Sequence, residues 1–247
     1  MTVPPPHSKT IAIIPSAGMG VRMGGRKKNF LPLLGRPALY HTLRPFEDSP
    51  LISSIVVAVR PGDEDLCLND VIGPYALRKV SKVVPGGKTR QDSVERALSF
   101  IEGNSDMVVI HDGARPLVTT GLIERVLREA AAKGAAIAAV RVKDTIKEVS
   151  GEKVTKTVPR ENLWSVQTPQ AFRTSILLNA LARAREDGFV GTDESSLVER
   201  TGVRVSVVEG SPENIKITTE EDIFLAECIL RRRAGGQGRE GGGGGAL

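Results

Sequence analysis

Residues 11–33 of the chain read IAIIPSAGMGVRMGGRKKNFLPL, an apolar run followed by a glycine-rich turn and a group of basic residues. The apolar run predicts a buried strand. Glycines let the backbone approach a ligand closely and leave amide N–H groups free to face an anion. The cations that could neutralise such an anion are Arg22, Arg26, Lys27 and Lys28. This order of features favours a polyphosphate site, most simply one for a nucleoside triphosphate.

The two familiar phosphate-binding motifs each fail here by one residue. In the dinucleotide pattern G-x-G-x-x-G, Gly18 and Gly20 fit, but Met23 takes the place of the third glycine. Gly87 begins the G-K-[ST] end of a P-loop, whose first glycine position is Lys82. Neither motif can be claimed, and a flexible turn after a first strand is the plainer alternative.

Composition narrows the class of protein. The 247 residues suffice for one sizeable α/β domain, and 40% apolar with 26% charged residues is typical of a soluble globular protein. No apolar run approaches the ~20 residues of a membrane span, and the first ten residues lack the apolar core of a secretory signal. Cys67 and Cys228 lack metal-ligand spacing. We therefore expect a cytoplasmic protein that does not bind membranes.

The formal charge of +5 admits nucleic-acid binding as an alternative. However, the basic residues are spread along the chain, and only six Phe, two Tyr and one Trp are available to stack on bases. Local cations beside glycine loops suit a small polyanionic ligand better, so no nucleic-acid partner is expected.

Strand-like and helix-like segments alternate along the chain. Apolar, β-branched runs predict strands at 10–15, 52–59, 80–84, 107–111, 135–142 and 203–208. Helical periodicity falls at 37–47, where a proline would be the first helical residue, and at 90–101, 120–133, 173–187 and 219–232. Alternation of this kind predicts an α/β fold, a largely parallel sheet with helices on both faces.

One segment breaks the alternation. Residues 143–149 and 153–158 are polar strand-like runs that predict a hairpin. The hairpin has too few apolar residues for a core, so it either packs on a second subunit or is a simple exposed arm. We expect a flexible N-terminus at 1–8, one domain at 9–233 with this arm at about 143–160, and a disordered Gly-rich tail at 234–247.

Polar loops follow the first, third and fourth expected strands. Ligands bind at the carboxyl ends of strands in such sheets, so loops 18–28, 85–93 and 112–116 should share one edge. Asp112 could hold Mg²⁺, which takes oxygen ligands and bridges phosphates, or it could simply form a turn. Arg115 could pair with a substrate phosphate or lie on the surface.

Two further segments could reach the same edge. Arg90 and Ser93 open a helix, whose N-terminus favours anions, although Ser93 could equally be a plain helix cap. Lys216 lies between two isoleucines in an expected short strand, so its side chain would point away from theirs. An ordinary edge-strand lysine is the alternative.

The sequence contains no recognisable Ser/His/Asp or Cys/His arrangement. The absence of such a catalytic arrangement suits a reaction in which a phosphomonoester attacks the α-phosphate of a nucleotide. The nucleophile is already anionic, because the second phosphate pKa is about 6, so no general base is required. Lysine, arginine and Mg²⁺ would align two anions and stabilise the departing pyrophosphate.

Eight segments together resemble a known family. They are PSAGMGVRM (15–23), KNFL (28–31), GGKTRQDS (86–93), HDGARP (111–116), KDTIK (143–147), TPQ (168–170), TDE (192–194) and NIKIT (214–218). In this order they resemble the 2-C-methyl-D-erythritol 4-phosphate cytidylyltransferases of the non-mevalonate isoprenoid pathway, over roughly residues 9–230. The resemblance implies a Rossmann-like fold, a homodimer built through the β-arm, and cytidylyl transfer from CTP to methylerythritol phosphate with Mg²⁺.

The resemblance also implies roles for individual residues. The nucleotide would be bound by Ser16, Ala17, Gly18, Gly20, Gly87, Arg90 and Ser93. Catalysis would fall to Arg22, Lys28 and Lys216, and the metal to Asp112. The methylerythritol phosphate would be held by Arg115, Thr192 and, from the partner's arm, Thr145 and Arg160.

The chain departs from the family at three positions. Lys27 replaces a common proline, which makes Lys27 and Lys28 rival catalytic candidates, and the Asn29-Phe-Leu that follows favours Lys28. Asn29-Phe30 replaces the commoner Gln-Tyr and removes a hydroxyl. Lys88 stands where some members have an acidic residue, so it is given no ligand role.

Other functions share part of this pattern. A cytidylyltransferase for another polyol phosphate, such as ribitol 5-phosphate, would differ only in its acceptor pocket. A nucleotidyltransferase making a nucleotide sugar or a modified cofactor is a further alternative. A nucleotide sensor would not need cations for a leaving pyrophosphate. A glycosyltransferase would be expected to carry Asp-x-Asp, and Ile110 stands in place of its first aspartate.

Overall fold

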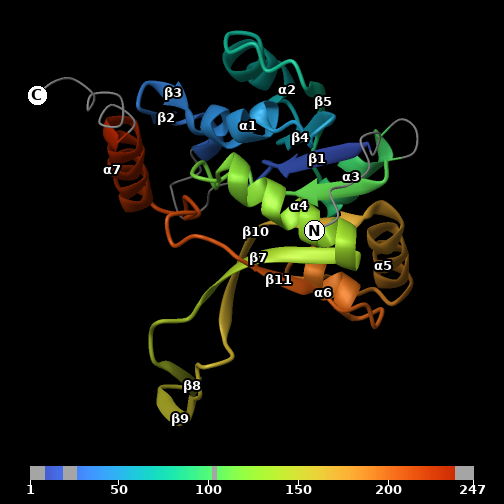
Figure 1. The fold of residues 1–247 in the computed structure, drawn as a ribbon, viewed down its shortest axis with the longest axis vertical. Helices are drawn as coiled ribbons and strands as arrows, with labels where there is room; N and C mark the ends of the chain where they lie inside the picture. The colour runs from blue at the N-terminus through green and yellow to red at the C-terminus, as the bar shows by residue number, and fades with distance from the viewer. Residues whose placement is uncertain (1–8, 19–26, 102–104, 237–247) are drawn as a thin grey trace, which may run out of the picture.

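The computed structural model describes residues 9–18, 27–101 and 105–236 (Figure 1). The strands are β1 (Thr10–Pro15), β2 (Pro32–Leu33), β3 (Arg36–Pro37), β4 (Ser54–Val59), β5 (Val80–Pro85), β6 (Met107–Ile110), β7 (Ala135–Arg141), β8 (Ile146–Ser150), β9 (Lys153–Val158), β10 (Trp164–Arg173) and β11 (Ser206–Glu209). The helices are α1 (Ala38–Asp48), α2 (Glu64–Cys67), α3 (Arg90–Ser99), α4 (Thr120–Lys133), α5 (Thr174–Glu186), α6 (Glu194–Glu199) and α7 (Glu220–Gly236), with short 3-10 and π turns at η2 (Lys28–Phe30) and η3 (Leu68–Ile72).

In this part of the chain, the central sheet has seven strands in the order β11-β7-β10-β6-β1-β4-β5. Strand β1 pairs in parallel with β4 on one side and β6 on the other, whereas β10 is antiparallel to both of its neighbours. The chain therefore proceeds outward in two directions from β1. Such a switch point is where open α/β sheets bind their ligands. The expected mostly parallel α/β fold is confirmed.

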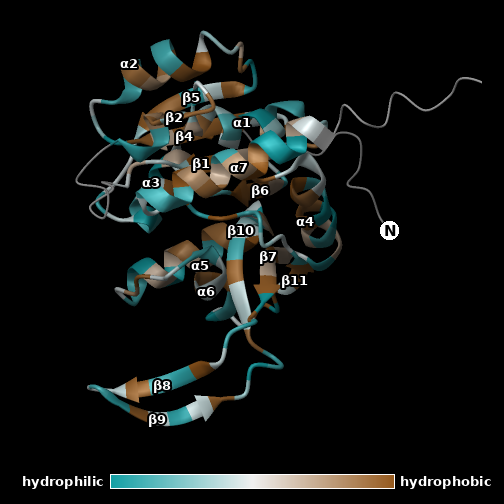
Figure 2. Ribbon diagram, turned by 90° about the vertical axis from the view of Figure 1, so that its left-hand side faces the viewer, coloured by the Kyte–Doolittle hydropathy of each residue, from teal (hydrophilic) through white to brown (hydrophobic). Residues whose placement is uncertain are grey.

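Helices cover both faces of the sheet, as the alternating side chains of β1 require. Ala12 and Ile14 pack with α1 and α4, whereas Ile11 and Ile13 pack with α3 and α5. All four residues are at most 7% exposed. Figure 2 shows the apolar residues concentrated in the strands and in the helix faces that cover them. A sheet buried on both sides explains why its strands read as nearly continuous apolar runs.

Most expected elements form within a few residues of their expected bounds, with some corrections. Pro37 precedes α1 and is not its first helical residue. Thr89, and not Ser93, caps α3, through a reciprocal capping box with Asp92. Residues 214–218 form no strand. Strand β10 was not expected, because its sequence WSVQTPQAFR mixes polar residues and a proline into the run.

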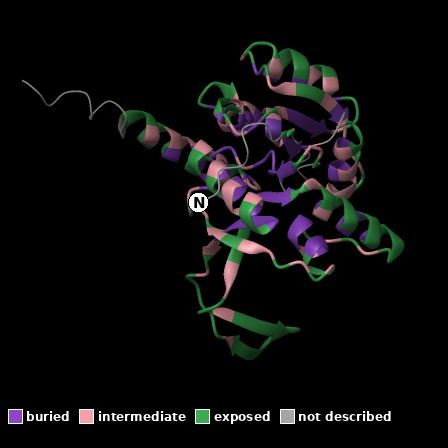
Figure 3. Ribbon diagram, turned by 45° about the vertical axis from the view of Figure 1, so that its right-hand side comes forward, coloured by how far each residue is buried: buried purple, intermediate pink, exposed green. Residues whose placement is uncertain are grey.

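The hairpin of β8 and β9 forms as expected and extends away from the sheet (Figure 1). Almost all of its residues are exposed, including Val149 and Val154 (Figure 3). Helix α7 continues to Gly236, past the position where the tail was expected to begin. The expected flexible N-terminus and residues 237–247 of the tail lie outside the described residues. Among the described helices, none is long and apolar enough to cross a bilayer.

Candidate active site

The loops at the carboxyl ends of β1, β5 and β6 meet around one cavity of about 370 Å³. Its lining combines backbone and side chains of Ser16, Ala17, Gly18, Lys28, Asn29, Arg60, Gly87, Lys88, Arg90, Ser93, Asp112 and Lys216, among others. The cavity thus lies where the chain switches direction about β1. The arginine that follows β4, Arg60, was not anticipated from the sequence.

Two glycines bring these loops into close contact. A Cβ on Gly113 would lie 2.0 Å from Oγ of Ser16, and one on Gly86 would lie 2.4 Å from Cβ of Ala17. Real Cβ contacts are essentially never this short, so a side chain at either position would force the neighbouring atoms to shift. The glycines therefore let the loops after β5 and β6 pack directly on the loop after β1.

Asp112 is the electrostatic centre of the site. Its Oδ1 accepts a hydrogen bond from Nε of Arg90 at 2.9 Å, and its Oδ2 lies 2.7 Å from Nζ of Lys216 and 3.7 Å from Nε of Arg115. Burial by itself would raise the pKa of Asp112, but Arg90 and Lys216 outweigh it and hold that pKa well below its usual range. The carboxylate is therefore ionised at neutral pH, within reach of three cations.

Arg90 joins Asp112 to a second carboxylate. Its Nη1 donates to both oxygens of Glu194, each at 2.7 Å. Burial opposes a charged Arg90, but Glu194 and Asp112 more than compensate and raise its pKa. Glu194 is 1% exposed, and burial raises its pKa although Arg90 opposes the shift. The sequence interpretation assigned no role to Glu194.

A second cavity of about 250 Å³ opens beside the first. Both cavities are lined by Arg90, Asp112 and Lys216. The second adds Arg115, Val166, Gln167, Thr168, Gln170, Thr192 and Asp193. Two ligands bound in these cavities would meet at the shared residues. The middle of β10, a strand that the sequence did not predict, supplies much of this second wall.

A hydrogen-bonded chain through His111 organises the second cavity. Oγ1 of Thr168 accepts from the Asp112 N–H at 3.0 Å and lies 2.9 Å from Nδ1 of His111, whose Nε2 is 3.1 Å from the Arg115 carbonyl. A carbonyl cannot donate, so Nε2 carries the ring proton and Nδ1 accepts from Thr168. Burial lowers the pKa of His111 to about 4, which keeps the ring neutral.

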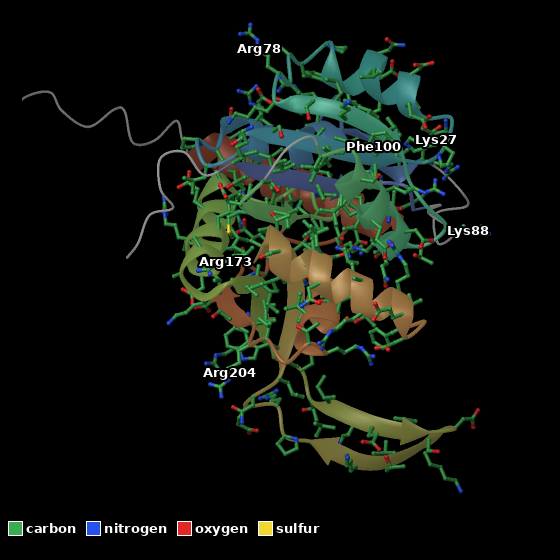
Figure 4. All side chains as sticks on the ribbon, turned by 90° about the vertical axis from the view of Figure 1, so that its right-hand side faces the viewer. Lys27, Arg78, Lys88, Phe100, Arg173 and Arg204 are labelled. Atoms are coloured by element: carbon green, nitrogen blue, oxygen red, sulfur yellow. The ribbon has the colours of Figure 1, made fainter. Side chains whose placement is uncertain are left out.

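The structure separates the two rival lysines. Nζ of Lys27 lies 2.5 Å from Oδ1 of Asp63, outside the cavity lining. Lys28 lines the first cavity, and its Nζ is 3.5 Å from the carbonyl oxygen of Ile217, next to Lys216. Figure 4 labels Lys27 and Lys88 on the same edge of the domain. The geometry supports Lys28 as the lysine that faces a ligand.

The other expected site residues divide into three groups. The residues that line a cavity are Ser16, Ala17, Gly18, Lys28, Gly87, Arg90, Ser93, Asp112, Arg115, Thr192 and Lys216. Thr145 and Arg160 lie on the exposed arm and line neither cavity of their own chain. Arg22 and Gly20 lie outside the described residues. Thr168 and Glu194 belong to the TPQ and TDE segments of the sequence. Their roles could not be predicted because the sequence does not show that both side chains are buried.

The donor set limits which metal the site could take. Among the described residues, no group of three His, Cys, Asp or Glu side chains could enclose an ion. Asp112 is the only carboxylate of the described lining of the first cavity. Such a site fits an ion that takes most of its ligands from substrate phosphates and water, as Mg²⁺ does.

Comparison with known proteins identifies the family. The family model for 2-C-methyl-D-erythritol 4-phosphate cytidylyltransferase matches residues 10–232. The proteins of that name from Desulforamulus reducens and Pelotomaculum thermopropionicum are 48% and 45% identical to the chain; the matches cover 90% and 95% of the chain and 96% and 99% of those proteins.

Solved structures of similar proteins point to the same family. The crystal structure of the cytidylyltransferase of this name from Thermus thermophilus matches with 38% identity and a TM-score of 0.75, over 90% of this chain and 99% of that one. The 4-diphosphocytidyl-2C-methyl-D-erythritol synthase from Anaerococcus prevotii matches with 31% identity and a TM-score of 0.79, over 91% and 99%. The chain thus belongs to the 2-C-methyl-D-erythritol 4-phosphate cytidylyltransferase family, nucleotidyltransferases of isoprenoid precursor synthesis that transfer the cytidylyl group of CTP to methylerythritol phosphate.

Proposed function

We propose that CTP binds in the first cavity and methylerythritol phosphate in the second, and that they react across the wall that the two cavities share. The observation that carries this proposal is the position of Arg90, Asp112 and Lys216, which line both cavities. A phosphate oxygen of the acceptor forms a bond to the α-phosphorus of CTP as the bond from that phosphorus to pyrophosphate breaks. No proton needs to be removed, because the attacking phosphate is already anionic.

The first cavity suits a nucleotide on chemical grounds. The loop after β1 and the turn at Gly87 line the cavity with backbone, and the hydrogen bond from the N–H of Gly87 to Oγ of Ser93, at 3.0 Å, holds that turn on the start of α3. We assign the cytidine to Gly87, Arg90 and Ser93, and the wrapping of the nucleotide to Ser16, Ala17, Gly18 and Gly20. Lys28 and Lys216 would stabilise charge on the reacting phosphates. The catalytic role of Arg22 rests on the family resemblance.

We assign Mg²⁺ to Asp112, with substrate phosphates and water completing its ligands. The ion would neutralise part of the triphosphate charge. Lys216 now lies 2.7 Å from Oδ2 of Asp112, so the ion and the lysine would compete for that oxygen. A lysine displaced from Asp112 would be available to the anionic substrates that line up beside it.

The acceptor pocket is proposed to be completed by a second subunit. Arg115 and Thr192 line the second cavity, whereas Thr145 and Arg160 lie on the arm, away from it. Arg160 donates to the carbonyl of Lys143 at the base of the hairpin. An exposed arm with apolar Val149 and Val154 has surface to bury against a partner, so we propose a homodimer in which each arm supplies Thr145 and Arg160 to the neighbouring site.

The thiols of Cys67 and Cys228 are unpaired, in keeping with a cytoplasmic enzyme.

A pyrophosphate-release assay tests the assignment of the two cavities. The enzyme is given CTP with methylerythritol phosphate, ribitol 5-phosphate or other polyol phosphates, and then ATP, GTP or UTP in place of CTP. We expect release with CTP and methylerythritol phosphate, and Arg115→Ala should raise KM for the acceptor with little change in KM for CTP. Equal effects on both substrates would contradict separate cavities.

A further inference from the structure

Glu194 is a buried carboxylate that lines neither cavity. It is the first residue of α6, and its side chain is 2% exposed. Nη1 of Arg90 donates to both of its oxygens, and Nε of the same guanidinium donates to Asp112 at 2.9 Å. Among the described residues, Arg90 is the side chain that both contacts Glu194 and lines the cavities, so Glu194 would act on a bound substrate through Arg90.

Strand β10 fixes Glu194 in place. Oε1 of Gln170 accepts from the N–H of Ser195 at 3.1 Å, and Nε2 of Gln170 donates to Oδ2 of Asp193 at 2.7 Å. Oδ1 of Asp193 accepts from the N–H of Ser196 at 2.9 Å and so caps α6. The residues on both sides of Glu194 are thus tied to the strand that forms the wall of the second cavity.

We propose that Glu194 is a positioning residue that fixes the plane of the Arg90 guanidinium on the wall shared by the two cavities. The proposal rests on the proposed role of Arg90 in binding the cytidine. Asp112 by itself holds one nitrogen of the guanidinium, which leaves the group able to turn about that bond. Carboxylates on two different nitrogens define its plane and direction, a constraint that lysine could not satisfy.

Glu194 also gives the Arg90 guanidinium a second carboxylate partner besides Asp112. Asp112 is within 3.7 Å of three cations, Arg90, Arg115 and Lys216. With Glu194 ionised, Arg90 is shared between two carboxylates and is held by both. A neutral side chain at position 194 leaves Arg90 held by Asp112 alone, so the guanidinium can turn about that contact and lose its orientation on the wall shared by the two cavities. The effect should therefore appear first in the binding of CTP.

The test measures the Kd for CTP by calorimetry, together with KM, kcat and thermal unfolding, in the intact enzyme with Mg²⁺. Glu194→Gln keeps the shape of the side chain and removes its charge, and the exposed Glu199→Gln on the same helix is the matched control. We expect Glu194→Gln to raise the Kd for CTP about tenfold, with kcat changed less than threefold, and Glu199→Gln to match the wild type. An unchanged Kd for CTP in folded Glu194→Gln would overturn the proposal.

Arg90→Lys separates positioning from a merely structural ion pair, because lysine keeps the charge but loses the planar group. In the Arg90→Lys background, Glu194→Gln should raise the Kd for CTP less than twofold further. A full tenfold effect there would mean that Glu194 acts by another route, and the proposal would fail. If Arg90→Lys itself left the Kd for CTP unchanged, the assigned role of Arg90 in the proposed function would be the part that fails. If Glu194→Gln does not fold, Glu194→Asp tests the geometric part by itself, because it keeps the charge but withdraws the carboxylate by one methylene from Nη1 of Arg90. The Kd for CTP should then rise at least threefold, and an unchanged Kd would overturn the proposal.

Discussion

Nζ of Lys216 lies 2.7 Å from Oδ2 of Asp112, on the wall that the two cavities share. The pair joins residues far apart in the chain, one after strand β6 and one in the segment before α7. A divalent ion that binds Asp112 must compete with this lysine. Burial would raise the pKa of Asp112, but Arg90 and this contact with Lys216 together lower it, so the carboxylate remains charged and able to accept the ion at neutral pH.

Asp112→Asn should lower kcat at least a hundredfold at ordinary Mg²⁺ concentrations, a loss of about 3 kcal/mol in transition-state stabilisation. An amide is a weaker metal ligand than a carboxylate, so excess Mg²⁺ should restore part of the rate. The measurement is a Mg²⁺ titration of pyrophosphate release. Asp70→Asn, at an exposed position away from both cavities, should follow the wild-type titration. Full activity of Asp112→Asn at ordinary Mg²⁺ would remove Asp112 from the metal site.

Lys28→Ala and Lys27→Ala should behave differently. Lys28 lines the nucleotide cavity, so Lys28→Ala should lose most pyrophosphate release, about a hundredfold in kcat, while CTP binding falls less. Lys27 is half exposed and paired with Asp63, so Lys27→Ala should cost about 1 kcal/mol of stability or less and leave kcat within a few-fold. Single-turnover rates and the Kd for CTP distinguish the two variants. The reverse ranking of the two rates would assign catalysis to Lys27.

Two inactive homodimers should complement each other if the arm completes the partner's site. Lys28→Ala damages the nucleotide cavity, and Arg160→Ala damages the arm. After subunit exchange, one site of each mixed dimer would combine an intact cavity with an intact arm, so about a quarter of wild-type activity is expected from random exchange. The measurement is pyrophosphate release after mixing, with exchange followed by native mass spectrometry. Complete exchange without recovered activity would show that the sites are not shared.

Acid should destabilise the fold through His111. The native pKa of this buried ring is lowered to about 4 from an ordinary 6.5. Between these values the unfolded chain binds a proton that the native ring does not, so the free energy of unfolding should fall by up to about 1.4 kcal/mol for each unit that the pH drops. Urea unfolding of wild type and His111→Gln from pH 7.5 to 4.5 tests this expectation. The variant should show a shallower slope, and equal slopes would contradict a neutral His111 in the native state.

Burial also lowers the pKa of His41, which adds a slope in the same direction. His41 is present in both proteins, so the difference between their slopes isolates His111. The hydrogen bond from Thr168 to Nδ1 gives a second readout, because a protonated ring could no longer accept it. Nitrogen chemical shifts of the imidazole should report the Nε2–H form throughout the range in which the enzyme remains folded.

The amino-acid sequence determined most of the sheet. Strand β1 was expected at residues 10–15 and forms there, and α4 was expected at 120–133 and forms there. Both are local patterns: an apolar β-branched run specifies a buried strand, and a 3.6-residue period specifies a helix with one buried face. The glycine loop and Asp112 could be singled out for the same reason, since they directly follow apolar strands. The family motifs then supplied the reaction, which no local pattern contains.

Only the tertiary structure decided which charged residues form ion pairs with one another. The sequence does not indicate that Arg90 pairs with Glu194, which is 104 positions away. Nor does it indicate that Lys27 pairs with Asp63, whereas Lys28 lines the cavity. Strand β10 was not predicted because its polar residues serve the site and weaken the apolar pattern typical of a strand. Pairing with two neighbouring strands stabilises it instead. Burial and long-range pairing set the charges of Asp112, Arg90 and Glu194. These are properties of the assembled sheet edge, since a side chain acquires its dielectric surroundings and its partners only when distant segments meet.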